Sequence, residues 1–157
     1  MDDDALFAEL YPRLRRFAAA IAAVDIDPDD LVQEAVARTL RKGPLCDLDD
    51  AALYLRRAVL NLTRNQHRDT TRRANILERT RLAIDHTDVY PSDFTDLSGL
   101  TVDQRAVLFL RFVENQSTGD IARMLDLTEN AVRARASRAI KTLRIDLEER
   151  STADEER

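Results

Sequence analysis

Cysteine, glycine, proline and tryptophan are scarce in this chain of 157 residues, and each scarcity excludes something. The single cysteine, Cys46, cannot form an internal disulfide, and one thiolate cannot supply the cysteine ligands of a structural metal site. With 3 Gly, 4 Pro and no Trp, the chain has few turn formers, whereas the helix formers Ala, Leu and Arg are abundant. The composition therefore predicts an all-α protein.

Long apolar runs are also missing. The chain opens with MDDD, which lacks the basic start and apolar stretch of a secretory signal. No segment approaches the roughly 20 apolar residues that a membrane helix needs. We therefore expect a cytoplasmic protein that does not insert into a membrane.

The net charge of -5 argues against nucleic-acid binding when it is taken alone, but the charges are strongly segregated along the chain. Residues 1–52 carry 12 acids and 6 bases, whereas residues 53–81 carry 2 acids and 8 bases. Residues 129–144 hold 1 acid and 5 bases, and the tail 145–157 holds 6 acids and 2 bases. Two separate basic stretches are thus available to contact an anionic partner.

Periodicity predicts helices in both halves of the chain, arranged as two small helical domains. In residues 4–23, apolar positions recur at three- and four-residue steps. A second helix is expected after Asp27, a suitable N-cap, and a third from about Ala51 to Arg73. These helices make up a first domain, residues 1–81.

The second half is predicted to contain a flexible linker and a second domain. Residues 82–98 are rich in turn formers and acids and lack periodicity, which is typical of a linker. The second domain is assigned to residues 99–147, and an acidic tail, residues 148–157, is expected to be disordered.

Residues 117–144 have the spacing of a helix-turn-helix: a Ser cap, a two-turn helix, the turn LDLT and a longer basic helix. A small apolar stripe on the longer helix leaves a polar and basic set facing outward. The residues of this set that suit a DNA duplex are Asn130, Arg133, Ser137, Arg138 and Lys141. A merely soluble basic surface explains the same charges, but the preceding turn and helix favour DNA binding.

A second candidate surface lies on the third predicted helix. Arg57, Asn61, Arg64 and Arg68 recur at steps of three and four, so they line one helix face, and Tyr54 adds a ring that can stack on a base. Packing between charges four residues apart is the alternative explanation. The run has almost no acids to pair with, so a polyanionic partner is favoured.

Other polar groups give weaker signals. Asp30, Gln33 and Glu34 share an exposed face of the second helix, which capping and solubility explain when it is taken alone. His67 and His86 lack metal spacing and clustered carboxylates, and Cys46 lies in an acidic loop that does not activate a thiol. We therefore expect no metal, no cofactor and no catalytic residues, so the chain is not predicted to be an enzyme.

The order of these motifs resembles that of bacterial sigma factors of the extracytoplasmic-function (ECF) type over nearly the whole chain. DPDDLVQEAVARTLRK resembles the polymerase-clamp helix of the family, and YLRRAVLNLTRNQHR resembles its minus-10 helix, with the motif Asn at Asn61. The stretch from Leu100 to Arg144 resembles the minus-35 domain. Tyr54 stands where the family usually has Trp, Asp126 replaces the usual turn Gly, and Ala136 replaces a larger apolar residue.

The resemblance implies a mechanism. Asp30, Gln33 and Glu34 would bind the clamp of core RNA polymerase. The third helix, with the set Tyr54, Arg57, Asn61, Arg64 and Arg68, would hold the opened minus-10 element, and the loop GPLCDLDD would cup a flipped base. The outward set on the longer helix-turn-helix helix would contact the minus-35 duplex of promoter DNA, with Arg135 nearer the core. An anti-sigma factor is a further candidate partner.

Two functions remain open on these grounds. The first is a sigma factor that directs promoter-specific transcription, with the chemistry left to the polymerase. The alternative is a helix-turn-helix regulator that acts without polymerase and needs no clamp-binding face.

Overall fold

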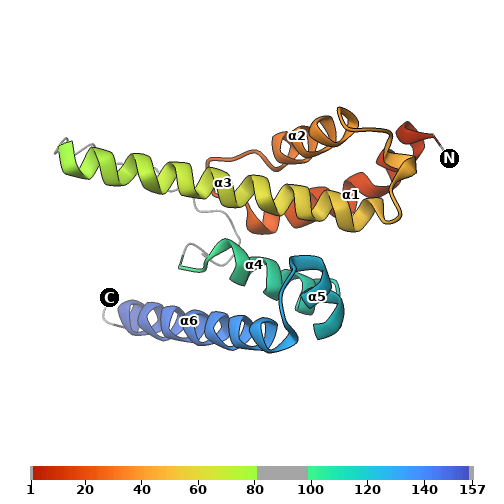
Figure 1. Ribbon diagram of the computed structural model, residues 1–157. Helices are drawn as coiled ribbons and strands as arrows, with labels where there is room; N and C mark the ends of the chain where they lie inside the picture. The colour runs from red at the N-terminus through yellow and green to blue at the C-terminus, as the bar shows by residue number, and fades with distance from the viewer. Residues whose placement is uncertain (1, 81–98, 156–157) are drawn as a thin grey trace.

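The computed structural model describes residues 2–80 and 99–155, and within these ranges the regular structure is entirely helical, which confirms the predicted fold class (Figure 1). The first domain consists of α1 (Asp3–Ile21), α2 (Pro28–Leu40), the short 3-10 helix η1 (Leu45–Asp47) and α3 (Ala51–Thr80). The second consists of α4 (Val102–Leu108), the π-helical turn η2 (Phe109–Val113), α5 (Thr118–Leu125) and α6 (Glu129–Glu155). The predicted linker, 82–98, lies outside the described residues.

Side-chain caps account for where the helices begin. The Asp27 carboxylate accepts a hydrogen bond from the Asp29 N–H at 2.8 Å, and Pro28 occupies the first turn of α2. Thr101 and Gln104 form a reciprocal capping box at the start of α4. These caps satisfy main-chain donors that have no partner within their own helix.

The first domain buries the apolar faces that the periodicity predicted. α1, α2 and α3 all pack against one another, and the deepest side chains are completely or almost completely buried. They are Leu14, Phe17, Ile21, Leu31, Val32, Leu55 and Val59. Burying a side chain of this size contributes about 1.5 to 3 kcal/mol, so this cluster holds the three helices together.

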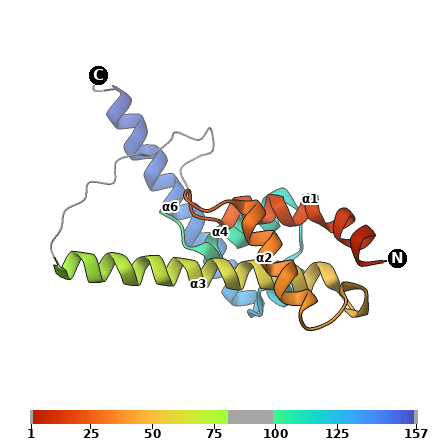
Figure 2. The ribbon, with the colours of Figure 1, turned by 90° about the horizontal axis from the view of Figure 1, so that it is seen from above.

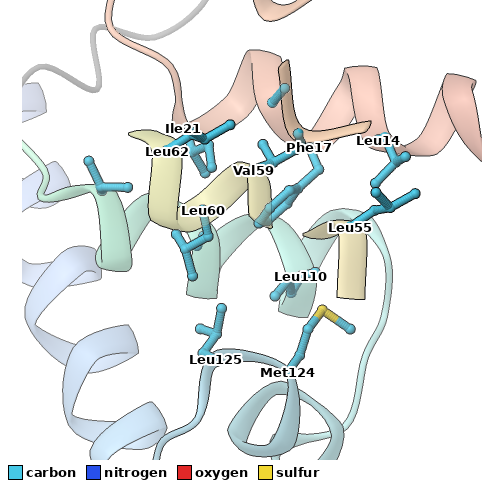
Figure 3. Close-up of a cluster of buried hydrophobic side chains, with 14 of the residues drawn as sticks. Leu14, Phe17, Ile21, Leu55, Val59, Leu60, Leu62, Leu110, Met124 and Leu125 are labelled. Carbon is cyan, nitrogen blue, oxygen red and sulfur yellow. The ribbon is translucent and has the colours of Figure 1, made fainter. Parts of the chain in front are cut away.

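The second domain is joined to the first by a continuous core rather than by the chain connection alone. α4 lies against α1 and α3, and α5 also contacts α3. Figure 3 shows Leu110 and Leu125 from the second domain facing Phe17, Val59 and Leu60 from the first. The ring of Phe17 also lies 6.0 Å from that of Phe109, measured between centroids. The two domains therefore share one buried apolar cluster.

Two helices are longer than the sequence predicted. α3 continues to Thr80 rather than ending near Arg73, and α6 continues to Glu155. The expectation of a disordered acidic tail was therefore wrong for residues 148–155, because Glu, Arg and Ala there continue a helix that is already nucleated. In Figure 2 the C-terminal ends of both helices project from the packed body.

No helix in the described parts of the chain is both long enough and apolar enough to cross a membrane.

Candidate nucleic-acid interface

The turn between α5 and α6 sets the position of the longer helix. Asp126 ends α5 in the left-handed conformation, with φ 56° and ψ 51°, and the Leu127 N–H donates to the Ala122 carbonyl at 2.8 Å. The Thr128 hydroxyl then accepts from the Ala131 N–H at 3.1 Å and caps α6. Asp126 therefore adopts the conformation for which glycine is usually favoured.

The structure places the whole predicted outward set of α6 on the surface. Asn130, Arg133, Ser137, Arg138 and Lys141 are all exposed. Beneath them Val132, Ala136 and Ala139 are buried and contribute to the contact of α6 with the rest of the second domain. An exposed polar and basic stripe on a helix that is fixed by its opposite face is an arrangement suited to a DNA groove.

Local pairing orders part of this stripe. Arg133 donates to the Asn130 side-chain oxygen at 3.2 Å and pairs with Glu129 at the same distance. Arg135 instead points toward the body, where its Nε lies 3.9 Å from a carboxylate oxygen of Asp103. The sequence expectation that Arg135 lies nearer the core agrees with this position.

The candidate residues on α3 are placed differently from one another. Arg68 and Asn61 are exposed, whereas Tyr54, Arg57 and Arg64 are partly buried. The Arg57 and Arg64 guanidinium groups both bond to the second domain, and Arg64 also donates to the Asn61 side-chain oxygen at 3.3 Å. The sequence placed these residues on one helix face, but it did not predict that the second domain would contact that face.

A groove of about 340 Å³ lies between α2 and α3, and its lining includes Tyr54, Arg57 and Asn61. Arg38 of α2 and Lys42, which follows the end of that helix, add basic groups to the same groove, and the Lys42 ammonium lies 3.4 Å from the Tyr54 hydroxyl. These two residues were not predicted from the sequence, because only the packing of α2 on α3 brings them to this groove.

A neighbouring hollow of about 270 Å³ is lined by Tyr54 and Arg57 together with Leu48, Asp50 and Leu53. Leu48 and Asp50 belong to the loop that the family resemblance linked to a flipped base. The structure therefore brings this loop, Tyr54 and the basic groove together at one end of α3.

The acidic face of α2 is exposed as expected. Asp30, Gln33 and Glu34 all lie on the surface, and Leu31 and Val32 are buried on the opposite side of the helix. The hydrogen bond from Arg38 at 2.5 Å lowers the pKa of the Glu34 carboxyl below its ordinary value. Glu34 is therefore ionised at neutral pH, and its charge is paired with that of Arg38.

The remaining polar candidates are possible metal ligands and the thiol of Cys46. Within residues 2–80 and 99–155, no group of three His, Cys, Asp or Glu side chains is arranged to hold a metal ion. Cys46 is exposed, and a hydrogen bond with the Asp3 carboxylate raises the pKa of its thiol. The thiol is thus less reactive than an ordinary cysteine. His86 lies outside the described residues.

Comparison with known proteins assigns the second domain. Residues 97–143 match the sequence profile of the family described as Sigma-70, region 4. This part of the chain is similar to sigma-70 region 4. The match includes α4, α5 and the part of α6 that carries the exposed stripe. We refer to the second domain from here on as the region 4 domain.

Relatives extend the likeness beyond this domain. The ECF RNA polymerase sigma factor SigX of Bacillus subtilis is 36% identical over 67 residues, which is 43% of this chain and 34% of SigX. The chain thus matches about a third of the length of that relative. Sigma factor RpoE of Bartonella quintana, solved in complex with the anti-sigma factor NepR, shares the fold with a TM-score of 0.70. That match covers 92% of this chain and 96% of RpoE at 21% identity.

These findings confirm the resemblance to ECF sigma factors that the motifs indicated. The roles of single residues on α2, α3 and α6 remain predictions.

Proposed function

We propose that this protein is an ECF-type sigma factor, which binds core RNA polymerase and directs it to a specific class of promoters. The observation that carries the proposal is the exposed basic stripe on α6 of a region 4 domain, in a chain that shares its fold with a sigma factor over nearly its full length. The chemistry of transcription belongs to the polymerase, and the site of action is the cytoplasm.

In this proposal, α6 enters the major groove of the minus-35 element. Arg133 and Arg138 present guanidinium groups that can bond base edges or phosphates, and Asn130 near the start of the helix can bond an adenine. Ser137 and Lys141 continue the same stripe toward the backbone. The left-handed turn at Asp126 sets the angle at which this stripe meets the duplex.

The first domain would hold the opened minus-10 element. The groove between α2 and α3 has basic side chains along its wall and Tyr54 at the junction with the neighbouring hollow. A single strand can place its phosphates against Arg38 and Lys42 and stack a base on Tyr54. Asn61, Arg64 and Arg68 continue the contact along α3.

The acidic face of α2 would bind the clamp of the polymerase. Asp30, Gln33 and Glu34 project from a helix whose other side is buried, so they form a rigid surface that needs little ordering upon binding. The RpoE relative forms a complex with an anti-sigma factor. By analogy we propose that a protein of that class binds this chain.

The decisive experiment is run-off transcription with core polymerase on a promoter library, in the presence and absence of this protein. A sigma factor yields transcripts that depend on the protein and share two spaced sequence elements. If the protein binds DNA but no transcript depends on it, the proposed function is wrong and a regulator that acts without polymerase is favoured.

A pull-down of core polymerase tests the α2 face. Asp30→Arg with Gln33→Ala should abolish the capture of polymerase by the protein. Asp69→Arg with Gln66→Ala is the matched control, because it makes the same changes at exposed residues three positions apart on α3. Equal capture by both double variants would show that the α2 face does not bind the clamp.

A further inference from the structure

Two arginines that the proposed function assigns to minus-10 DNA are already bonded to the region 4 domain. The Arg57 guanidinium donates to the main-chain carbonyls of Met124, at 3.1 Å, and Arg123. The Arg64 guanidinium donates through Nε and Nη2 to one carboxylate oxygen of Asp103, at 2.8 and 2.7 Å. Each guanidinium group therefore directs two of its nitrogen atoms at the other domain.

The groups that receive these arginines are chemically similar to a nucleic-acid backbone. Arg123 and Met124 lie in the last turn of α5, where main-chain carbonyls have no partner within the helix and carry the negative end of its dipole. Asp103 supplies a full negative charge. A phosphate backbone likewise offers closely spaced oxygen atoms with negative charge to an arginine.

Other contacts hold the domains in this position. Arg56, which neighbours Arg57, forms an ion pair with Glu114 of the region 4 domain at 2.5 Å, and both side chains are nearly buried. Phe17 packs on Phe109 in the shared core, and Arg105 donates to the Ala22 carbonyl at 3.3 Å. The arrangement is thus a built interface with apolar, ionic and hydrogen-bonded parts.

We propose that this interface is autoinhibitory, in the sense that the region 4 domain and minus-10 DNA compete for Arg57 and Arg64. In the closed form the carbonyl end of α5 and the Asp103 carboxylate occupy the two guanidinium groups. The same closed form draws in Asn61, whose side-chain oxygen accepts from Arg64. DNA binding by the first domain then requires the region 4 domain to move away. This inference rests on the proposed function for the identity of the DNA surface.

In competition of this kind, the apparent affinity for DNA is the affinity of the open form multiplied by the fraction of molecules that are open. Variants that weaken the interface without touching a DNA-binding residue should therefore bind DNA more tightly. Asp103→Asn with Glu114→Gln meets this condition, because both changes are nearly isosteric and both lie on the region 4 side. Glu148→Gln with Glu149→Gln is the matched control, since it removes the same charge from exposed positions on α6.

The test uses the full chain and two measurements. Dyes on the native Cys46 and on Ser151→Cys, both exposed, report the separation of the domains by energy transfer. Fluorescence anisotropy with a labelled single-stranded DNA of random sequence reports the affinity. Circular dichroism checks folding, and if the double variant unfolds, Asp103→Asn and Glu114→Gln are measured singly.

The expected result is that the interface variant alone loses energy transfer and binds the random strand roughly three- to tenfold more tightly than the control. Unchanged energy transfer would overturn the proposal, because these contacts would not be holding the domains. Opening without a gain in affinity over the control would also overturn it, because the interface would not compete with DNA. No polymerase is used, so a negative run-off assay would refute the sigma-factor function and leave this result interpretable.

Discussion

Replacing Asp126 tests whether the turn before the recognition helix has the left-handed geometry that the structure shows. Asp126 is exposed and has φ 56° and ψ 51°, so substitutions there change backbone strain without altering a buried contact. A left-handed conformation costs an ordinary L-residue about 1 to 2 kcal/mol, with Asp and Asn near the lower end. A negative charge at the end of a helix costs about another 0.3 to 1 kcal/mol.

These terms predict an order of stability. Asp126→Gly removes the strain and the charge but adds about 0.4 to 1 kcal/mol of unfolded-state entropy, so a net gain of about 0.5 kcal/mol is expected. Asp126→Asn should give a similar gain, because it removes only the charge and tolerates this conformation. Asp126→Val also removes the charge, but a β-branched residue meets a larger steric cost than an ordinary L-residue here, so this variant should lose about 1 kcal/mol. The Gly and Val variants should then differ by roughly 3 to 6 °C in melting temperature.

The assay is thermal and urea unfolding of each variant, monitored by circular dichroism. Arg41 is the matched control, because it is also an exposed helix C-cap but has φ -65°, a right-handed value. At Arg41 the glycine variant should be no more stable than the valine variant. If glycine and valine rank the same way at Arg41 and Asp126, the left-handed geometry is not what determines stability at the turn.

Three further predictions concern single side chains. Burial lowers the pKa of the Arg105 guanidinium, and its Nε lacks a hydrogen-bond partner among the described residues. Arg105→Met should therefore change the free energy of unfolding by only about 0 to +1 kcal/mol. A loss above about 2 kcal/mol in urea unfolding would contradict this. Arg138→Ala should weaken binding to the preferred minus-35 duplex by about 1 to 3 kcal/mol in a gel-shift assay, whereas an equal loss on every sequence would indicate a phosphate contact instead. The hydrogen bond from the Cys46 N–H lowers the pKa of the Asp3 carboxyl. The contribution of this hydrogen bond to stability is therefore present above the ordinary Asp pKa and is lost as the pH falls through the lowered value. Asp3→Asn should therefore be less stable than the wild type at neutral pH, and thermal unfolding should show this difference disappearing in acid.

Much of the local structure was predictable from residue order, because its causes are local. The caps at Asp27, Thr101 and Ser117 and the apolar faces of the helices follow from neighbours within a few positions. The exposure of the stripe on α6 follows in the same way, since Val132, Ala136 and Ala139 define the opposite, buried side. These are the features on which the family resemblance depended.

The lengths of α3 and α6 were harder to predict for a different reason. Both end in polar segments with no apolar period to mark a boundary, and a helix already nucleated by packing continues through good helix formers. The groove beside Tyr54 was also unpredictable, because Lys42 reaches it only after α2 has packed on α3.

Taken by itself, the sequence determined that the chain is helical, that it contains a helix-turn-helix with a basic outward face, and that a second basic face lies on α3. Short-range capping and periodicity are sufficient for all three. Only the tertiary structure decided that the region 4 domain packs on the first domain and that Arg57 and Arg64 bond to it. These contacts join residues far apart in the chain, such as Arg64 and Asp103, and complementary charge across an interface leaves no periodic trace in either segment.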